Sequence, residues 1–387
     1  MKTAAVVAEY NPFHKGHEYQ LEMTRKAGAT HIVAIMSGNF VQRGEAAVYD
    51  KFLRAKAAVN CGADLVVELP LPWAMSGAQS FARGAVSIAR SLSCVDMLSF
   101  GCESGDLQKL MQLARAVYSA KYEKHISEYL KTEANFASAR QMAAAKLLGE
   151  DAARLLESPN NILAVEYIAA AENMNCGFEF NAVARMGDGY NSCVHSGSGY
   201  ASATAIRKQI KQNSLDLSLV PSTAAGLYTA DYADEARLET ALLYALRRMD
   251  INEIAQAPDI SEGIENRIYS AVEKACSYNE LFELIKTKRY PDARIRRIIL
   301  SLFLGIKKEH SVGLPPYIRV LACGEKGREV LKAAKPLVPL AARASQINEL
   351  SDSAKQIFEL ECKADDTHAL CFSKPHECGR YFKTQVF

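Results

Sequence analysis

The 387-residue sequence lacks several features that would place it in a specialised class of protein. No apolar run is long enough to span a membrane, because the stretch from Asp64 to Met75 is short and is interrupted by Glu68, Pro70 and Pro72. One lysine precedes a strand-like segment at the N-terminus, which is unlike a signal peptide. Internal repeats and low-complexity segments are also missing. We therefore expect a globular cytoplasmic protein with no membrane partner.

Cysteine pairing and excess charge are missing as well. The ten cysteines are scattered singly, which favours reduced thiols in a chain of this size. A net charge of +2 gives no overall attraction to nucleic acid, so an RNA partner would need a local basic surface. The single tryptophan, Trp73, is expected to pack in the core. Near the C-terminus the spacing of the cysteines and histidines matches no standard zinc module, and we predict no metal site there. These residues are Cys362, His368, Cys371, His376 and Cys378.

What is present in the first hundred residues is an alternation of short apolar runs and helical patterns. Such strand–helix alternation predicts an α/β fold with an open, mostly parallel sheet covered by helices on both faces. A fifth strand is expected over Gly177–Arg185 and a late strand over Tyr317–Cys323. The first four expected strands are Ala4–Ala8, His31–Met36, Asp64–Leu69 and Val95–Phe100.

Two changes in the pattern suggest how the chain is divided. Strand signals stop from residue 106 to about residue 157, which predicts a helical insertion. The composition shifts near residues 213–222 and is mostly helical afterwards. We therefore predict a first domain over residues 1–215, which contains the insertion, and a largely helical second domain over residues 216–387.

The most informative stretch is His14-Lys15-Gly16-His17, which lies between the first expected strand and the helix that follows it. The start of a helix offers free backbone N–H groups and a partial positive charge, both of which suit phosphate. His14 and His17 are three residues apart, so their imidazoles project from the same side of the first turn. The pattern predicts a nucleotide phosphate held by two imidazoles. Two alternatives remain: the histidines could only cap the helix, or they could bind zinc. A third zinc ligand is missing nearby.

A second polar helix start lies at Ser202-Ala203-Thr204-Ala205-Ile206-Arg207. Ser202 is suited to cap the helix, while Thr204 and the forked Arg207 are suited to hold a departing pyrophosphate. Plain helix capping and a solvated arginine are the alternatives. An earlier helix is expected to begin at Ser158, with Pro159 in its first turn and Asn161 shortly after.

These motifs resemble those of the HxGH nucleotidyltransferases, which have a Rossmann-like fold and carry a second phosphate motif of the form Ser-x-Ser/Thr-x-x-Arg. The longer segments are similar to the bacterial tRNA(Met) cytidine acetate ligases, and the similarity extends over essentially the whole chain. The segments that carry this resemblance are Val7–His17, Ser37–Glu45, Ser158–Leu163 and Lys288–Arg297.

The resemblance implies an enzyme that activates acetate with ATP, forming acetyl-adenylate and pyrophosphate. The acetyl group would then pass to N4 of the wobble cytidine of elongator tRNA(Met). Magnesium is expected with ATP, and no protein metal site is implied. His14, His17 and Arg207 would be catalytic, and Ser202 and Thr204 would contact ATP phosphates. The other residues implied to bind ATP are Val7, Ala8, Glu9, Tyr10, Asn11, Pro12, Phe13, Lys15, Gly16, Glu18, Tyr19, Gln20, Gly101, Asn161 and Arg185.

A local basic segment is the expected tRNA contact, although a solvated helix face is the alternative. Its candidate residues are Lys288, Arg289, Arg294, Arg296 and Arg297. The loop from Ser37 to Glu45 is a candidate acetate or acceptor loop in which Arg43 would steer a carboxylate. Two other functions stay open from the residues alone: a small-molecule adenylyltransferase or pantothenate-synthetase-like ligase, and a non-catalytic RNA-binding protein. The sequence does not define an oligomeric state.

Overall fold

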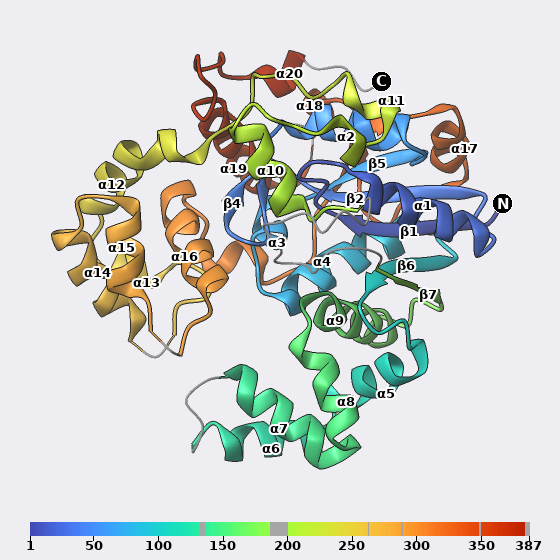
Figure 1. The fold of residues 1–387 in the computed structure, drawn as a ribbon, viewed down its shortest axis with the longest axis horizontal. Helices are drawn as coiled ribbons and strands as arrows, with labels where there is room; N and C mark the ends of the chain where they lie inside the picture. The colour runs from blue at the N-terminus through green and yellow to red at the C-terminus, as the bar shows by residue number, and fades with distance from the viewer. Residues whose placement is uncertain (132–135, 186–199, 262, 288, 348–349, 384–387) are drawn as a thin grey trace.

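The fold is built on a seven-stranded sheet in the part of the chain that the structure describes (Figure 1). That structure is a computed structural model describing residues 1–131, 136–185, 200–261, 263–287, 289–347 and 350–383. The strand order is β7-β6-β1-β2-β5-β8-β9. The first five of these pair in parallel, whereas β8 runs antiparallel to β5. The strands of this sheet are β1 (Thr3–Ala8), β2 (His31–Ser37), β5 (Leu65–Leu69), β6 (Met97–Cys102), β7 (Glu179–Ala184), β8 (Ile318–Cys323) and β9 (Leu340–Ala341).

Both faces of the sheet are buried, which explains why its strands read as continuous apolar runs. Ala4 and Val6 of β1 pack in the cluster that contains residues of α1 (Lys15–Lys26) and α2 (Lys51–Asn60). Ala5 faces the other way, into the larger cluster with α4 (Ala78–Ser91) and α9 (Pro159–Asn173). Alternating side chains of one strand therefore serve two cores, and the predicted α/β fold with helices on both faces is confirmed.

The helices fall into groups that Figure 1 separates in space. Helices α5 to α8 form an arm at one end of the molecule, where the helical insertion was expected, and helices α12 to α16 lie together on one flank. The remaining helices are α3 (Leu71–Ala74), α5 (Leu107–Val117), α6 (Ala120–Tyr129), α7 (Phe136–Leu148), α8 (Glu150–Arg154), α10 (Ala203–Lys211), α11 (Ser222–Ala225), α12 (Glu239–Arg247), α13 (Ile251–Ala255), α14 (Ile264–Lys274), α15 (Tyr278–Ile285), α16 (Asp292–Leu304), α17 (Glu325–Ala333), α18 (Ala344–Ile347), α19 (Asp352–Ala369) and α20 (Arg380–Lys383).

The C-terminal half contributes to two different cores. Helices α12 to α16 share their own apolar cluster, which Phe40 and Leu71 join from the first half of the chain. The late strand β8, by contrast, completes the main sheet beside β5. Residues on both sides of the predicted boundary thus pack together, and the division near residue 215 stays a prediction.

The loop after β2 is a small hairpin. Its two strands, β3 (Phe40–Val41) and β4 (Glu45–Ala46), are antiparallel and hold Gln42 and Arg43 at the turn. Gly44 has a φ of +73°, and a Cβ there would lie 2.5 Å from the backbone nitrogen of Arg297. Glycine is therefore required where this hairpin meets α16.

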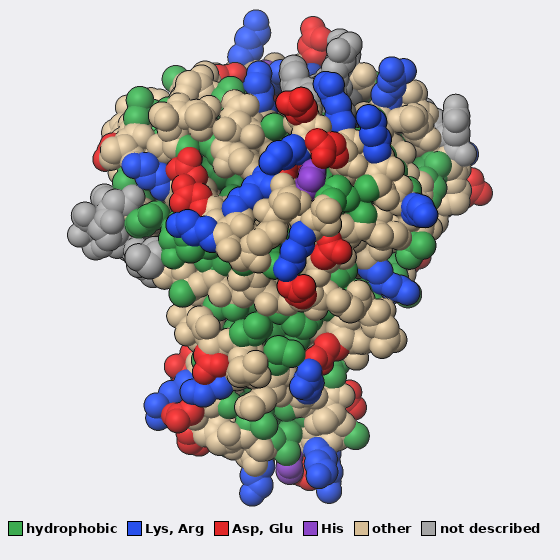
Figure 2. All heavy atoms as spheres, turned by 90° about the vertical axis from the view of Figure 1, so that its right-hand side faces the viewer, with side chains coloured by type: hydrophobic (Ala, Val, Ile, Leu, Met, Phe, Trp, Pro, Cys, Tyr) green, Lys and Arg blue, Asp and Glu red, His purple; other side chains and the backbone are tan. Residues whose placement is uncertain are grey.

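Two surface properties follow the composition. On the face shown in Figure 2, basic and acidic side chains are interspersed, as a net charge of +2 suggests. Among the described helices, none combines the length and the apolar character needed to cross a bilayer.

Candidate active site

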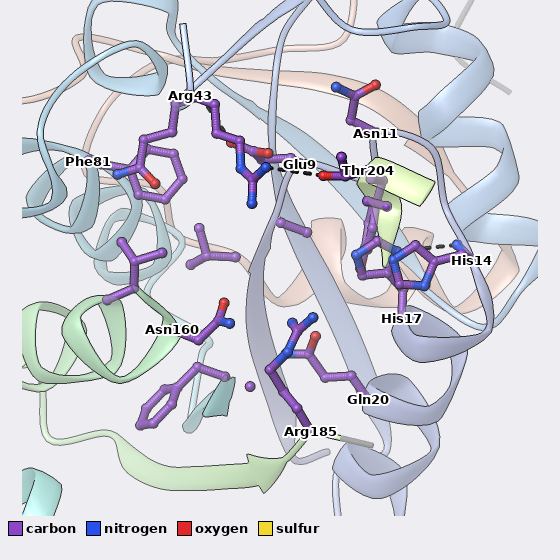
Figure 3. A pocket seen from close by; sticks show the side chains of 18 of the residues that line it. Glu9, Asn11, His14, His17, Gln20, Arg43, Phe81, Asn160, Arg185 and Thr204 are labelled. Carbon is purple, nitrogen blue, oxygen red and sulfur yellow. Dashed lines mark hydrogen bonds between the residues drawn. The ribbon is translucent and has the colours of Figure 1, made fainter. Parts of the chain in front are cut away.

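A pocket lies at the carboxyl ends of β1 and β6. At this point the strand order reverses, because β2 and β5 lie on one side of β1 and β6 lies on the other. Parallel sheets bind ligands at such a switch point. The pocket is partly open to solvent. Residues from β1, α1, β6, α9, α10 and the β3–β4 hairpin contribute to its wall (Figure 3).

The first turn of α1 presents the two histidines to this pocket. His14 is the N-cap, and its Nδ1 accepts a hydrogen bond from the backbone N–H of Gly16 at 3.0 Å. Nδ1 of His17 accepts from the backbone N–H of His14 at 3.2 Å. The two rings are stacked with centroids 3.8 Å apart. Each histidine therefore uses one nitrogen to hold the helix start, and the shared direction expected from their spacing is confirmed.

These hydrogen bonds also set the protonation of the imidazoles. Because each Nδ1 accepts, the proton of each neutral ring lies on Nε2. Burial, together with Arg185 and Arg207 nearby, lowers the pKa of His14 to about 3. Burial, His14 and Arg185 lower the pKa of His17 well below its usual value. Both rings are thus neutral Nε2–H donors at physiological pH.

The start of α10 forms another part of the pocket wall. Ser202 caps the helix, as expected, by accepting from the backbone N–H of Ala205 at 3.1 Å. Arg207 donates from Nη1 to the backbone oxygen of Asn11 at 2.9 Å and from Nη2 to the Thr204 hydroxyl at 3.3 Å. Arg43 reaches the same Thr204 hydroxyl from the hairpin at 3.2 Å. Two guanidinium groups and a hydroxyl thus gather on this side of the pocket.

Glu45 connects this wall to the C-terminal helices. Its carboxylate pairs with Arg207 at 3.2 Å and with Arg296 of α16 at 3.4 Å. Glu45 does not line this pocket, but its carboxylate orients Arg207, which does. The same anion that orients Arg207 also fixes the hairpin against α16.

Not every residue that the sequence suggested for ATP faces the pocket. Twelve do line it: Val7, Ala8, Glu9, Tyr10, Asn11, His14, His17, Gln20, Gly101, Arg185, Thr204 and Arg207. Eight do not: Pro12, Phe13, Lys15, Gly16, Glu18, Tyr19, Asn161 and Ser202. Several of the eight support the wall from behind, as Gly16 and Ser202 do through the helix caps.

Asn161 is one of these supporting residues. It is buried, and its Oδ1 accepts from the backbone N–H groups of Glu103 and Ser104 at 2.9 and 3.2 Å. Its neighbour Asn160 lines the pocket instead. Asn161 therefore holds the chain that follows β6 in place, and Gly101 lies at the end of that strand, close to Arg185.

The basic segment does not line this pocket and is largely engaged within the protein. Arg297 pairs with Asp259 at 2.8 Å, and Arg294 donates to the backbone oxygen of Asp259 at 2.7 Å while lying over the Tyr290 ring. Arg289 is exposed, and Lys288 lies outside the described residues. A tRNA contact by this segment stays a prediction.

Several pocket residues were not predicted from the sequence as ATP or catalytic residues. They are Gln42, Arg43, Phe81, Phe100, Asn160, Leu163, Tyr167 and Ala203, of which only Arg43 was considered as a substrate contact. The helical residues among them belong to apolar faces that look like ordinary core. Gln42 had a signal, because it lies in the polar hairpin between two glycines.

Arg54 was also missed, although it organises the loops around the pocket. It is fully buried in α2, and its Nε donates to the backbone oxygen of Tyr49 at 3.0 Å. Its guanidinium also donates to the backbone oxygens of Glu9, Ser37 and Gly38, at the ends of β1 and β2. An arginine in an alanine-rich helix gives no sequence signal for such a role.

Among the described residues, no group of three or more histidine, cysteine or acidic side chains is arranged to hold a metal ion. His368, from the C-terminal group considered for zinc, is buried with Nε2 at 2.7 Å from the backbone oxygen of Ala47. The residues that line the pocket offer hydrogen-bond donors for an anion. These donors are two Nε2–H groups, guanidinium groups and helix starts.

Comparison with known proteins agrees with this geometry. The family model described as HIGH Nucleotidyl Transferase matches residues 1–380. A tRNA(Met) cytidine acetate ligase of Thermoanaerobacter sp. (strain X514) is 36% identical over 99% of this chain and 98% of its own length. One from Acetivibrio thermocellus is 34% identical over 100% of this chain and 99% of its own length.

Two solved structures have the same fold. The apo crystal structure of Thermotoga maritima TmcAL superposes with a TM-score of 0.93 at 31% identity, covering 100% of this chain and 99% of that one. The crystal structure of the same protein bound with alpha-thio ATP gives a TM-score of 0.92 at 30% identity, again over 100% and 99% of the two chains. The likeness therefore extends over the whole chain in both sequence and fold.

Proposed function

This chain belongs to the HIGH nucleotidyl transferases and, among them, to the tRNA(Met) cytidine acetate ligases; on that premise we propose that it acetylates cytidine in tRNA(Met) with ATP and acetate. The observation that carries the proposal is the pocket between two helix starts. One start brings the Nε2–H groups of His14 and His17, and the other brings Thr204 and Arg207. This is a site for a nucleoside triphosphate.

In the first step an oxygen of acetate attacks the α-phosphorus of ATP. The new O–P bond gives acetyl-adenylate, and the bond from the α-phosphorus to the bridging oxygen breaks to release pyrophosphate. Acetate is already ionised at neutral pH, so this step needs no base. It needs donors aimed at the phosphoryl oxygens, where negative charge accumulates in the transition state.

We assign these donors by their position. The neutral imidazoles of His14 and His17 donate from Nε2 to the α-phosphate, and the N-terminus of α1 adds its partial positive charge. Arg207, Thr204 and the start of α10 hold the β- and γ-phosphates and then the leaving pyrophosphate. Adenosine would occupy the end of the pocket formed by Gln20, Gly101 and Arg185. Magnesium would arrive with ATP as part of the substrate, because it binds through phosphates and water as readily as through carboxylates.

In the second step the acetyl group passes to N4 of the wobble cytidine of elongator tRNA(Met), and AMP leaves. We propose that tRNA lies over the hairpin, α16 and the segment just before α16, because these carry Arg43, Arg296 and Arg289. The enzyme would work in the cytoplasm, where its tRNA substrate is found.

The first step is tested by acetate-dependent exchange of labelled pyrophosphate into ATP. Purified protein with ATP and magnesium should show exchange only when acetate is added, and propionate or butyrate should support less. Exchange that ignores acetate would instead favour a small-molecule adenylyltransferase.

A further inference from the structure

The acetyl-transfer step has a requirement that the phosphate donors do not meet. When N4 of cytidine attacks the acetyl carbonyl, a C–N bond forms, the C–O bond to AMP breaks, and N4 must lose a proton. His14 and His17 cannot take it, because each Nδ1 already accepts a hydrogen bond and each Nε2 carries a hydrogen. Arg43 and Arg207 have no acceptor atoms. The pocket therefore needs another group.

Glu9 is the one carboxylate among the described residues that line the pocket. It follows the last residue of β1, and its Oε1 accepts a hydrogen bond from the backbone N–H of Gln42 at 2.9 Å. That bond fixes the side chain, yet a carboxylate can accept several hydrogen bonds and so keeps capacity for another donor. Glu9 is thus positioned and able to accept a proton.

The place of Glu9 separates it from the nucleotide. A carboxylate repels phosphates and offers them no hydrogen, so it is poorly suited to contact the phosphates of ATP. In Figure 3, Glu9 lies on the side of Arg43 and the hairpin, away from Gln20 and Arg185. This side is the one open to the substrate that accepts the acetyl group, if adenosine occupies the other end.

We propose that Glu9 is the general base of acetyl transfer, a catalytic residue that takes the N4 proton of cytidine as the amide bond forms. This inference rests on the proposed function of the pocket. Atoms and charges balance: the amine loses one proton to the Glu9 carboxylate, the acetyl carbon exchanges an oxygen of AMP for N4, and AMP leaves as an anion. Glu9 then returns its proton to solvent.

The surroundings of Glu9 favour this task. Burial raises its pKa above the usual range, while Arg43 and Arg207 oppose that rise, Glu45 adds to it, and the hydrogen bond from Gln42 opposes it. The buried Arg54 also faces it from α2, donating to its backbone oxygen. A carboxylate with a raised pKa is a stronger base.

The decisive experiment separates the two half-reactions in a Glu9→Gln variant. Glutamine keeps an oxygen for the Gln42 N–H but cannot take a proton. Single-turnover transfer from enzyme-bound acetyl-adenylate to tRNA should fall about 100-fold or more. Acetate-dependent pyrophosphate exchange should fall far less, and acetyl-adenylate should accumulate. Equal losses in both assays, or undiminished transfer, would overturn the proposal.

A matched control and a second measurement guard against misfolding. Glu22→Gln is the same change at an exposed position of α1, and it should leave both half-reactions as in the unmodified protein. In the unmodified enzyme, single-turnover transfer should rise with pH through the raised pKa of Glu9, and exchange should lack that rise. A transfer rate that is flat with pH overturns the proposal even if the Gln variant does not fold. Absence of exchange in the unmodified enzyme would instead overturn the proposed function itself.

Discussion

The imidazole of His14 stacks on that of His17 with ring centroids 3.8 Å apart, and both rings direct Nδ1 to backbone N–H groups of the same helix start. This arrangement leaves two Nε2–H groups as the outward donors. It also ties the proposed catalysis to folding, because the atoms that cap α1 belong to the residues that we propose to face the substrate. Variants must separate these two roles.

Replacement of His14 by asparagine is the variant that does so. Asparagine is a good N-cap and can still accept from the helix N–H groups, but it lacks the Nε2–H donor. We expect acetate-dependent exchange to fall by about 10²- to 10³-fold while the melting temperature changes little. His17→Ala should lose a comparable factor. Exchange kinetics measure the loss of activity, and thermal unfolding measures the change in stability of both variants. A variant as active as the unmodified enzyme would contradict the proposed donor role of its histidine.

The pH dependence of exchange follows from the lowered pKa values of both histidines. An ordinary histidine changes charge near pH 6.5, whereas burial and nearby arginines lower the pKa of His14 to about 3 and that of His17 in the same direction. Their protonation therefore requires acid well below pH 6.5, and both remain neutral above it. Exchange measured from about pH 5.5 to 7.5 should show no step attributable to histidine. A step near pH 6.5 that disappears in His14→Asn would show a charged imidazole instead.

Arg207 is expected to depend on its forked shape as well as its charge. It contacts the Asn11 backbone, Thr204 and Glu45 at once, which a lysine cannot do. Arg207→Lys should raise the KM for ATP and lower the rate of exchange by roughly tenfold or more. This is the factor expected from the loss of about one charge-assisted hydrogen bond. Arg296→Lys is the matched control, because Arg296 shares Glu45 but does not line the pocket. Similar losses of exchange in both variants would assign the effect to Glu45 and the hairpin.

The basic segment contains residues with different expected roles. Arg289 is exposed, so Arg289→Ala should weaken tRNA binding and leave exchange unaffected. The tRNA affinity of the variant should also depend less on salt concentration than that of the unmodified enzyme. Arg297 pairs with Asp259, so Arg297→Ala should mainly lower the melting temperature. Filter binding at several salt concentrations and thermal unfolding distinguish the two. Unchanged tRNA affinity in Arg289→Ala would remove this residue from the tRNA contact.

The sequence predicted the parts of the fold that depend on local pattern. The runs around Val6 and Val33 identified buried parallel strands, and Ser202 identified a helix start, because strand burial and capping leave signals within a few residues. The late strand over Tyr317–Cys323 was also predicted, but its antiparallel place beside β5 was not. Such pairing depends on contacts between residues more than 200 positions apart, which a local pattern does not contain.

The site was predictable to a similar degree. His14 and Arg207, the residues proposed to contact phosphate, come from motifs with fixed spacing, and both line the pocket. Phe81 and Leu163 line it too, but their spacing is that of any core helix. Arg54 lies behind the pocket and donates to backbone oxygens. Because every residue has a backbone oxygen, the sequence does not reveal such partners. Residues that act through the backbone or through an apolar wall become visible only once the chain is folded.

A single assay of the complete reaction tests whether this pocket activates acetate and delivers the acetyl group to cytidine. Purified enzyme is incubated with ATP, magnesium, isotopically labelled acetate and elongator tRNA(Met), and the digested nucleosides are separated by mass. We expect labelled N4-acetylcytidine, one per tRNA, together with AMP and pyrophosphate. We also expect far less product with the His17→Ala enzyme and none with tRNA that has uridine at the wobble position. Labelled product that forms equally with the His17→Ala enzyme, or no acetylated cytidine at all, would contradict this role of the pocket.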